Sequence, residues 1–288
     1  MIKELTSLRF VLILLIFLHH ISDSFYPGGG TLGVSFFFIL GGFCTTLGYK
    51  DKVTRDDFSY GSYLKNRLIK FYPLHWLCLL IALAWALLMS QSITTKGLAV
   101  LGINAALLQS WIPLKGIYFS YNAVSWYLSN TVFFVFAFPV VAKLLMRKRS
   151  RYLFLLILLL TYSALCVFLP KDYVHAILYI NPLVRLCDFI VGILAALLYT
   201  DIRKHKPYMF VNLAGKALGI IIFAGLIVMS LVINKDIQLM AWIYWIPCII
   251  LLIIIALGGG GQYFDSNLSL RSGTAVLLSF SYTNYASR

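Results

Sequence analysis

The chain alternates long apolar segments with short polar ones. Eight of the apolar segments are about 17 to 22 residues long, which is the length that a helix needs to cross the hydrocarbon core of a bilayer. They are residues 8–26, 32–49, 71–90, 124–142, 152–169, 178–199, 217–233 and 239–257. A shorter apolar segment occupies 98–112, and a last one occupies 273–287.

This pattern predicts an all-α fold, a polytopic transmembrane helix bundle with about 8 to 10 spans. A β-barrel would instead show strands of about ten residues with alternating polarity. Composition supports the bundle, since 61% of the residues are hydrophobic and 12% are charged, whereas soluble domains carry about 25% charged residues. We expect a single membrane domain over residues 1–288, with an incomplete last helix.

The basic residues are concentrated in three connections. These are 50–70, 143–151 and 201–216, whereas 22–31, 170–177 and 234–238 contain few basic residues. Because Lys and Arg accumulate in cytoplasmic loops, the three basic connections and the N-terminus are predicted to be cytoplasmic. The net charge of +14 is therefore explained by membrane topology, and we expect no nucleic-acid partner.

The positions of the first two basic connections restrict what 98–112 can be. Connections 50–70 and 143–151 share one side of the membrane only if an even number of spans separates them. Segments 71–90 and 124–142 already supply two. The segment at 98–112, with Gly102 and Asn104 inside it, is then re-entrant or interfacial, unless the charge rule fails here.

The first apolar helix contains Arg9, His19 and His20. Arg9 and His20 are eleven residues apart, so a helix separates them by roughly 16 Å. Ionisable groups inside apolar segments usually face a protein interior and mark a functional site, and histidine suits proton transfer near neutral pH. Asp23 follows His20 by three residues and could support its charge. The alternative is that one histidine only caps the helix end.

Two further pairs of charged residues are three positions apart. Arg67 and Lys70 share one helix face at the predicted cytoplasmic end of the third segment, where they could clamp the phosphates of a ligand or simply anchor the helix. Arg185 and Asp188 lie inside an apolar segment and are predicted to neutralise each other. A structural ion pair and a substrate contact are both open for them.

Glycines are frequent from Gly28 to Gly33 and recur at Gly41 and Gly42. No Lys-Ser/Thr pair follows at phosphate-loop spacing, so these glycines either let helices approach closely or keep an outer entrance open. The five cysteines all lie in apolar segments without paired spacing. We therefore expect neither disulfides nor a metal site.

Taken together, these stretches resemble the acyltransferase-3 family of membrane O-acyltransferases over about residues 5–260. Five motifs carry the resemblance in the order expected for that family. They are Leu8-Arg9-Phe10 with the helix ending at His20, Gly33 to Phe43, Arg67 to Pro73, Ser125 to Ser129, and Asn181 to Gly192.

The resemblance implies specific roles. His20, which ten intervening residues separate from Arg9, matches the family's catalytic base, and we expect Asp23 to assist it. Arg67 and Lys70 match the family's Arg-x-x-Arg motif for the acyl donor, with Arg9 as a further donor contact. The remaining motifs supply four candidate substrate-binding residues, Ser35, Trp126, Arg185 and Asp188.

The sequence departs from the family pattern at several positions. Lys70 replaces the second Arg of the donor motif, which keeps the charge and loses the bidentate fork. Thr131 stands where the family usually has a glutamate, and the usual Leu-Ser-Gly-Phe reads Leu40-Gly41-Gly42-Phe43. The family's last helix begins to be matched at Ser279 to Tyr282, shortly before Arg288.

The function implied is transfer of an acyl group, expected to be acetyl, from cytosolic acetyl-CoA to a hydroxyl of an extracytoplasmic glycan. The partners would be acyl-CoA, a carbohydrate acceptor and the lipid bilayer, in a bacterial inner (plasma) membrane. Two alternatives stay open. One is a non-enzymatic transporter or flippase of a lipid-linked glycan or anion, and the other is a truncated inactive relative.

Overall fold

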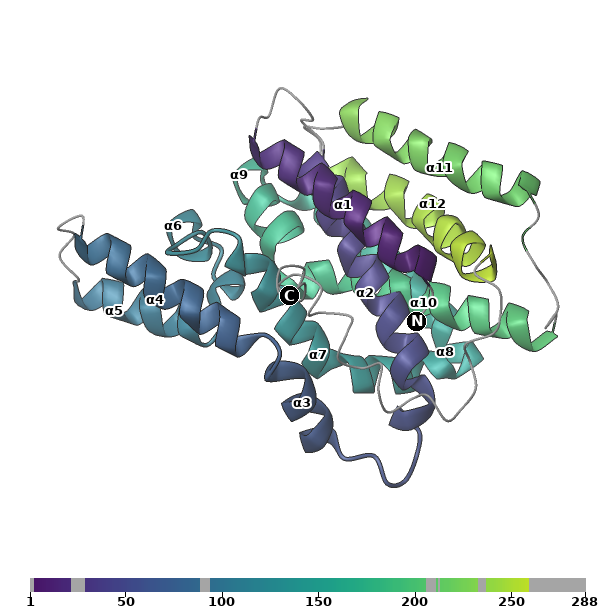
Figure 1. Ribbon diagram of the computed structural model, residues 1–288, viewed down its shortest axis with the longest axis horizontal. Helices are drawn as coiled ribbons and strands as arrows, with labels where there is room; N and C mark the ends of the chain where they lie inside the picture. Colours follow the sequence, from purple (N-terminus) through teal and green to yellow (C-terminus); the bar gives the residue numbers. More distant parts are fainter. Residues whose placement is uncertain are drawn as a thin grey trace, which may run out of the picture.

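Helices packed side by side make up the protein in the computed structural model (Figure 1), which describes residues 3–21, 29–88, 94–205, 211, 213–232 and 237–258. The α-helices are α1 Lys3–Ile21, α2 Gly29–Val53, α3 Tyr60–Leu68, α4 Tyr72–Leu88, α5 Thr95–Ala105, α6 Lys115–Tyr118, α7 Ser125–Met146, α8 Lys148–Phe168, α9 Lys171–Val174, α10 Pro182–His205, α11 Leu213–Val232 and α12 Ile237–Gly258. A 3-10 helix, η1 (Gln109–Trp111), and a π-helix, η2 (His175–Ile180), complete the elements. The predicted all-α class is confirmed for the residues that the structure describes.

Polar side chains at the starts of three helices explain where those helices begin. Ser59 caps α3 by accepting a hydrogen bond from the backbone N–H of Ser62, and Thr94 caps α5 in the same way through Gly97. At α10, the side chain of Asn181 accepts from the N–H of Leu183 (3.0 Å). Each cap satisfies an N–H that has no partner inside the helix.

The predicted count of 8 to 10 spans is not confirmed. Among the residues that the structure describes, five helices are long and apolar enough to cross a membrane, or six if α3 and α4, which meet at 42°, form one broken span. The five are Gly30–Val53, Ser125–Met146, Arg151–Phe168, Pro182–His205 and Leu213–Val232. Leu5–Ile21 in α1 and Ile243–Gly258 in α12 are apolar but shorter. The predicted segment at 273–287 lies outside the described residues.

Helices α2 and α10 form the centre of the bundle and approach each other at two glycines. A Cβ on Gly42 would collide with the carbonyl oxygen of Phe189, and a Cβ on Gly192 would collide with that of Ile39. Each glycine therefore leaves the space that the backbone of the opposite helix occupies. This favours close helix packing as the role of the glycines in α2.

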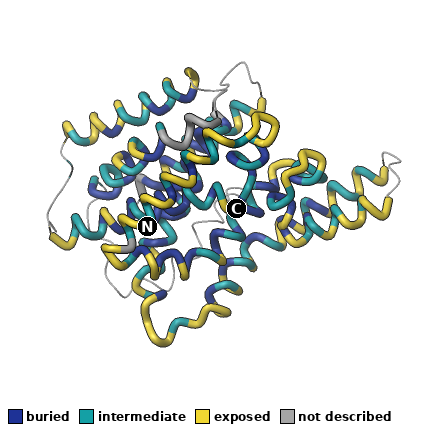
Figure 2. The backbone as a smooth tube through the Cα atoms, turned by 180° about the vertical axis from the view of Figure 1, so that it is seen from behind, coloured by how far each residue is buried: buried dark blue, intermediate teal, exposed yellow. Residues whose placement is uncertain are grey.

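Large apolar side chains gather around this helix pair and make it the core. Phe36, Phe38 and Phe43 of α2 are fully buried, as are Phe134 and Phe138 of α7. In contrast, α8 and α11 expose most of their apolar surface (Figure 2). Exposed apolar helices around a buried centre are typical of a bundle whose outer surface meets lipid.

The predicted re-entrant segment at 98–112 contains α5, a turn and η1. Helix α5 runs back along α4, with the Trp76 indole donating to the carbonyl of Ala105 (3.0 Å). The two helices project from the side of the bundle (Figure 1). With 11 residues, α5 extends only about 16 Å, which is too short to cross a bilayer. Whether it enters the membrane stays a prediction.

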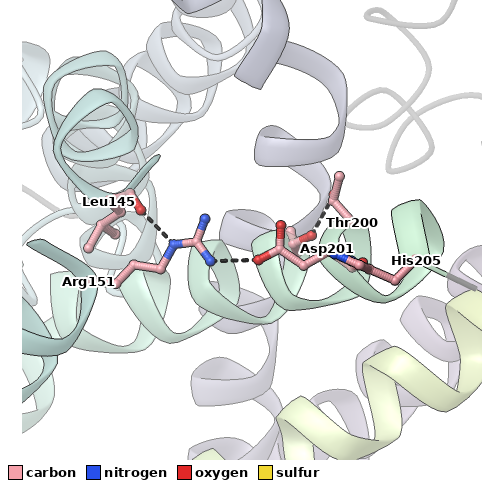
Figure 3. Close-up of polar contacts among 6 residues, drawn as sticks. Leu145, Arg151, Thr200, Asp201 and His205 are labelled. Carbon is pink, nitrogen blue, oxygen red and sulfur yellow. Dashed lines mark hydrogen bonds and ion pairs between the residues drawn. The ribbon is translucent and has the colours of Figure 1, made fainter. Parts of the chain in front are cut away.

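The basic connections gather at one end of the bundle, which we call the basic end. Lys143 of α7 lies 5.8 Å from the ring of Phe58, which precedes α3. Arg151 of α8 donates to the carbonyl of Leu145 (2.7 Å) and pairs with Asp201 of α10 at 2.8 Å (Figure 3). The structure thus brings together parts of all three segments, as the parity argument requires. That this end is cytoplasmic remains a prediction.

Candidate functional site

Helix α1 turns Arg9 toward α2. The Arg9 guanidinium donates to the sulfur of Cys44 at 3.0 Å, in a half-buried position. Among the described residues, no acidic side chain is paired with Arg9. A cation held inside the bundle without an acidic partner is costly, so it suits a place where an anionic or strongly polar ligand binds.

At the other end of α1, the two histidines point in different directions. His19 packs on α2, because a Cβ on Gly30 would come within 2.5 Å of its ring. His20 is exposed, and its Nδ1 lies 2.8 Å from the carbonyl oxygen of Ile16. That contact requires the proton on Nδ1, which leaves Nε2 with a lone pair. Asp23, the predicted assistant, lies outside the described residues.

Arg67 of α3 is buried, although it carries a full charge. It is 6% exposed, and its guanidinium carbon lies 4.4 Å from the centre of the Tyr49 ring and 5.9 Å from that of Tyr63. No acid pairs with Arg67 in the part of the chain that the structure covers, and its Nε has no hydrogen-bond partner there. The predicted partner Lys70 lies in the turn after α3, within electrostatic reach of Arg67.

Three of the four predicted substrate-binding residues meet in one buried network. Arg185 and Asp188 form an ion pair at 2.9 Å, which confirms that they neutralise each other. Arg185 also donates to the Ser35 hydroxyl at 3.0 Å, and the Trp245 indole donates to Asp188 at 2.7 Å. The network therefore joins α2, α10 and α12.

The fourth predicted residue, Trp126, lies beside this network rather than in it. Its ring centre is 5.0 Å from that of Tyr179, and Tyr179 in turn lies 5.4 Å from the Arg185 guanidinium. Trp126 and Arg185 thus face the same tyrosine from α7 and α10. We call the end of the bundle where α7 and α10 begin the far end.

Several neighbours of the predicted residues could not be found from local sequence. Cys44 and Trp245 lie far along the chain from Arg9 and Asp188, which they contact, and Tyr179 lies far from Trp126. In the sequence, the only signal for these three residues is an aromatic ring or a thiol inside an apolar segment. Thr131, which stands where the resemblance expects a glutamate, donates to the carbonyl of Tyr127 in its own helix (2.9 Å).

The arrangement separates two kinds of chemistry along α1. Unpaired guanidinium groups near the basic end can bind phosphate or a polarised carbonyl oxygen. An imidazole with a fixed proton on Nδ1 and a lone pair on Nε2, near the other end of α1, can accept a proton from a hydroxyl. The eleven helical steps from Arg9 to His20 place these groups roughly 16 Å apart along the helix.

Comparison with known proteins identifies acyltransferases as relatives of the chain. The model of a family described as an acyltransferase domain matches residues 2–285. A relative from Streptomyces mycarofaciens, acyltransferase MdmB, is 26% identical over 227 residues, which are 68% of this chain and 57% of the relative. The chain therefore spans somewhat more than half of that relative's length. No solved structure matches it. The match over nearly its whole length shows that the chain belongs to the acyltransferase-3 family.

Proposed function

We propose that the protein is an integral-membrane O-acyltransferase that moves an acyl group, expected to be acetyl, from acyl-CoA at the basic end to a hydroxyl of a glycan at the far end. The family match supports acyl transfer by a membrane protein. The observation that carries the proposed role of His20 as the general base is its hydrogen bond to the carbonyl of Ile16. It leaves Nε2 of His20 able to accept a proton, on the helix that also holds Arg9.

In the proposed reaction, Arg67 and Lys70 bind the phosphates of the donor at the basic end, and Arg9 binds a further oxygen of the donor there. The pantetheine arm extends into the bundle and carries the thioester to His20. The Nε2 of His20 accepts the proton of the acceptor hydroxyl as its oxygen attacks the thioester carbonyl. The bond between the acyl carbon and sulfur then breaks, and the proton passes to the leaving thiolate. His20 is regenerated in its neutral form.

Replacing His20 by alanine should abolish acyl transfer while the protein still folds. General base catalysis contributes about 100-fold or more to rate, so transfer of radiolabelled acetyl from acetyl-CoA to envelope glycans should fall by at least that factor. Folding is checked by size-exclusion chromatography in detergent. His205→Ala is the matched control, since His205 of α10 makes the same bond to the carbonyl four residues before it (2.8 Å).

The His20 assignment has a clear competitor in His19. Loss of turnover in His19→Ala together with retained turnover in His20→Ala would overturn it. Folded wild-type protein that neither binds acyl-CoA nor transfers label would contradict the enzyme proposal as a whole and leave a transporter or a silent relative.

Replacing Arg67 by glutamine should weaken the binding of acyl-CoA without altering the binding of the acceptor. A charge-assisted hydrogen bond is worth about 1.5–3 kcal/mol, so the KM for acyl-CoA should rise by roughly 10-fold or more. The comparison variant is Arg55→Gln, because Arg55 lies in the same basic connection but is exposed and paired with Asp57 at 2.8 Å. An unchanged KM in the Arg67 variant would remove Arg67 from the donor site.

A further inference from the structure

The far end carries a group of aromatic rings, of which the roles assigned above include only Trp126. We call it the aromatic site, and it consists of Tyr118, Phe119, Trp126, His175 and Tyr179. The His175 ring lies 5.3 Å from Tyr179 and 5.9 Å from both Tyr118 and Phe119, measured between ring centres. The Tyr179 ring in turn lies 5.0 Å from the Trp126 ring. Rings from α6 and the residue after it thus meet His175, and a ring from α7 meets Tyr179, both on η2.

The backbone that presents two of these rings is unusual. His175–Ile180 is a π-helix of six residues, a rare conformation that often occurs at functional sites. It directly precedes Asn181, the residue that caps α10. His175, Tyr179 and Phe119 are partly exposed, whereas Tyr118 and Trp126 are buried behind them. A ligand could therefore reach three of the five rings.

Two buried amide side chains beside the aromatic site lack a donor for their oxygens. Gln109 donates to the Ser125 hydroxyl at 2.9 Å, and Asn130 donates to the carbonyl of Ile180 at 3.1 Å. Both residues are fully buried, yet Gln109 Oε1 and Asn130 Oδ1 have no hydrogen-bond partner among the described residues. An unsatisfied buried acceptor is costly. A hydroxyl, or a water held by one, would supply the missing donors.

His175 suits an uncharged ligand. Burial and the nearby positive charge of Lys115 lower the pKa of His175, so its ring is neutral near pH 7. Its Nδ1 lies 3.2 Å from the Tyr118 hydroxyl, which leaves Nε2 for another hydrogen bond. Lys115, Tyr118, Phe119 and Tyr179 are the groups found around it, and no acid is paired with it in the described part of the chain.

The aromatic site lies at the end of the bundle that holds His20. The Tyr179 hydroxyl interacts with the side chain of Thr31 in the first turns of α2. Thr31 follows Gly30, the residue on which His19 packs. A ligand on Tyr179 is thus on the side of the bundle where α1 ends, as an acyl acceptor for His20 must be.

We infer that the aromatic site recognises the acceptor, and that the acceptor presents an uncharged sugar ring there. Aromatic faces pack against the C–H face of a pyranose, and one of its hydroxyls bonds the neutral imidazole. A water held by the sugar would reach the buried amide oxygens. This inference rests on the proposed function and adds His175 and Tyr179 to it as acceptor-binding residues. Neither residue takes part in the proton transfer.

The test measures donor and acceptor separately on purified protein in detergent. The variants are His175→Ala and Tyr179→Ala, with His175→Gln and Tyr179→Phe as conservative forms. A panel of methyl glycosides serves as acceptor, and release of CoA from acetyl-CoA reports turnover. Calorimetry without acyl-CoA gives glycoside binding directly. Tyr173→Ala is the matched control, because Tyr173 is an exposed aromatic residue of α9, two positions before His175.

For both alanine variants we expect the glycoside KM and Kd to rise by roughly 10-fold or more, since a ring contact or a hydrogen bond is lost. The KM for acetyl-CoA and the kcat at saturating acceptor should stay within about threefold, and the conservative variants should recover part of the binding. A structural role would not separate these constants.

Three results would overturn the inference. They are an unchanged glycoside KM in folded alanine variants, a change in the acetyl-CoA KM instead, and wild-type protein that binds no glycoside in the panel. Failure of the proposed function looks different. Glycosides would then still bind at the aromatic site, but no acetyl-CoA would be bound or consumed.

Discussion

The Gly192→Ala variant should fail to form a stable bundle. Its new methyl group would meet the backbone carbonyl of Ile39, which cannot move aside as a flexible side chain can. Helices α2 and α10 would have to separate, and the aromatic packing between Phe38, Phe134 and Phe189 would open with them. Overpacking typically costs about 1–3 kcal/mol, and we expect the upper end or more here because backbone must move. Size-exclusion chromatography in detergent should show aggregated protein, or a strongly lowered Tm.

Gly48→Ala is the matched control for this experiment. Gly48 lies in α2, but nothing stands within 4 Å of a Cβ built on it. The substitution should be neutral or stabilise the helix by up to about 1 kcal/mol, because alanine has the higher helix propensity. Equal Tm values for the Gly192 and Gly48 variants would show that α2 and α10 do not pack through these glycines.

Replacing Asp188 by alanine should have the next largest effect on stability. Asp188 and Arg185 are 2% and 5% exposed, and the substitution would leave the guanidinium buried without its carboxylate. Removing one partner of a buried pair costs about 3–5 kcal/mol. The Tm in detergent should fall accordingly. Asp57→Ala, which breaks an exposed pair with Arg55, should cost about 1 kcal/mol at most.

A double variant separates the two roles that the sequence leaves open for this pair. Arg185→Met with Asp188→Leu removes both charges and keeps apolar volume, which is often tolerated in a protein interior. A folded and active double variant would make the pair purely structural. A folded variant that loses acceptor turnover would make Arg185 or Asp188 a substrate contact. For the single Asp188→Ala variant, a fall in Tm no larger than that of Asp57→Ala would contradict the buried ion pair itself.

Helix positions could be predicted from the sequence, because a long apolar segment has no other way to satisfy its backbone in lipid. Each of the eight predicted segments contains one long helix. The number of spans could not be predicted as well. Helix α5 contains the apolar run 98–103 and yet stops at Ala105, shortly before Leu107, which adopts a positive φ of 56° where the chain turns. The hydropathy of the sequence does not reveal where the chain turns, so it could not show that this segment ends early.

For the candidate site, contacts within one helix were predictable and contacts between helices were not. Arg185 and Asp188 are three residues apart, so their pairing follows from helix geometry. The bond from Arg185 to Ser35 joins residues 150 positions apart. The different directions of His19 and His20 depend on where α2 packs. The glycines predicted close approach without naming the partner, which is α1 for Gly30 and Gly33 and α10 for Gly42.

The contact between Gly42 and Gly192 also bears on how the protein is made. The two glycines are 150 residues apart in the sequence, and ribosomes add about 5–20 residues per second. Helix α2 therefore waits for roughly 8 to 30 s in the membrane before α10 is synthesised. During that time the surface of α2 around Gly42 lacks α10, the helix that packs on it. The central packing of the bundle is thus completed late in synthesis, and the nascent chain depends on lipid or an insertion factor to shield α2 until then.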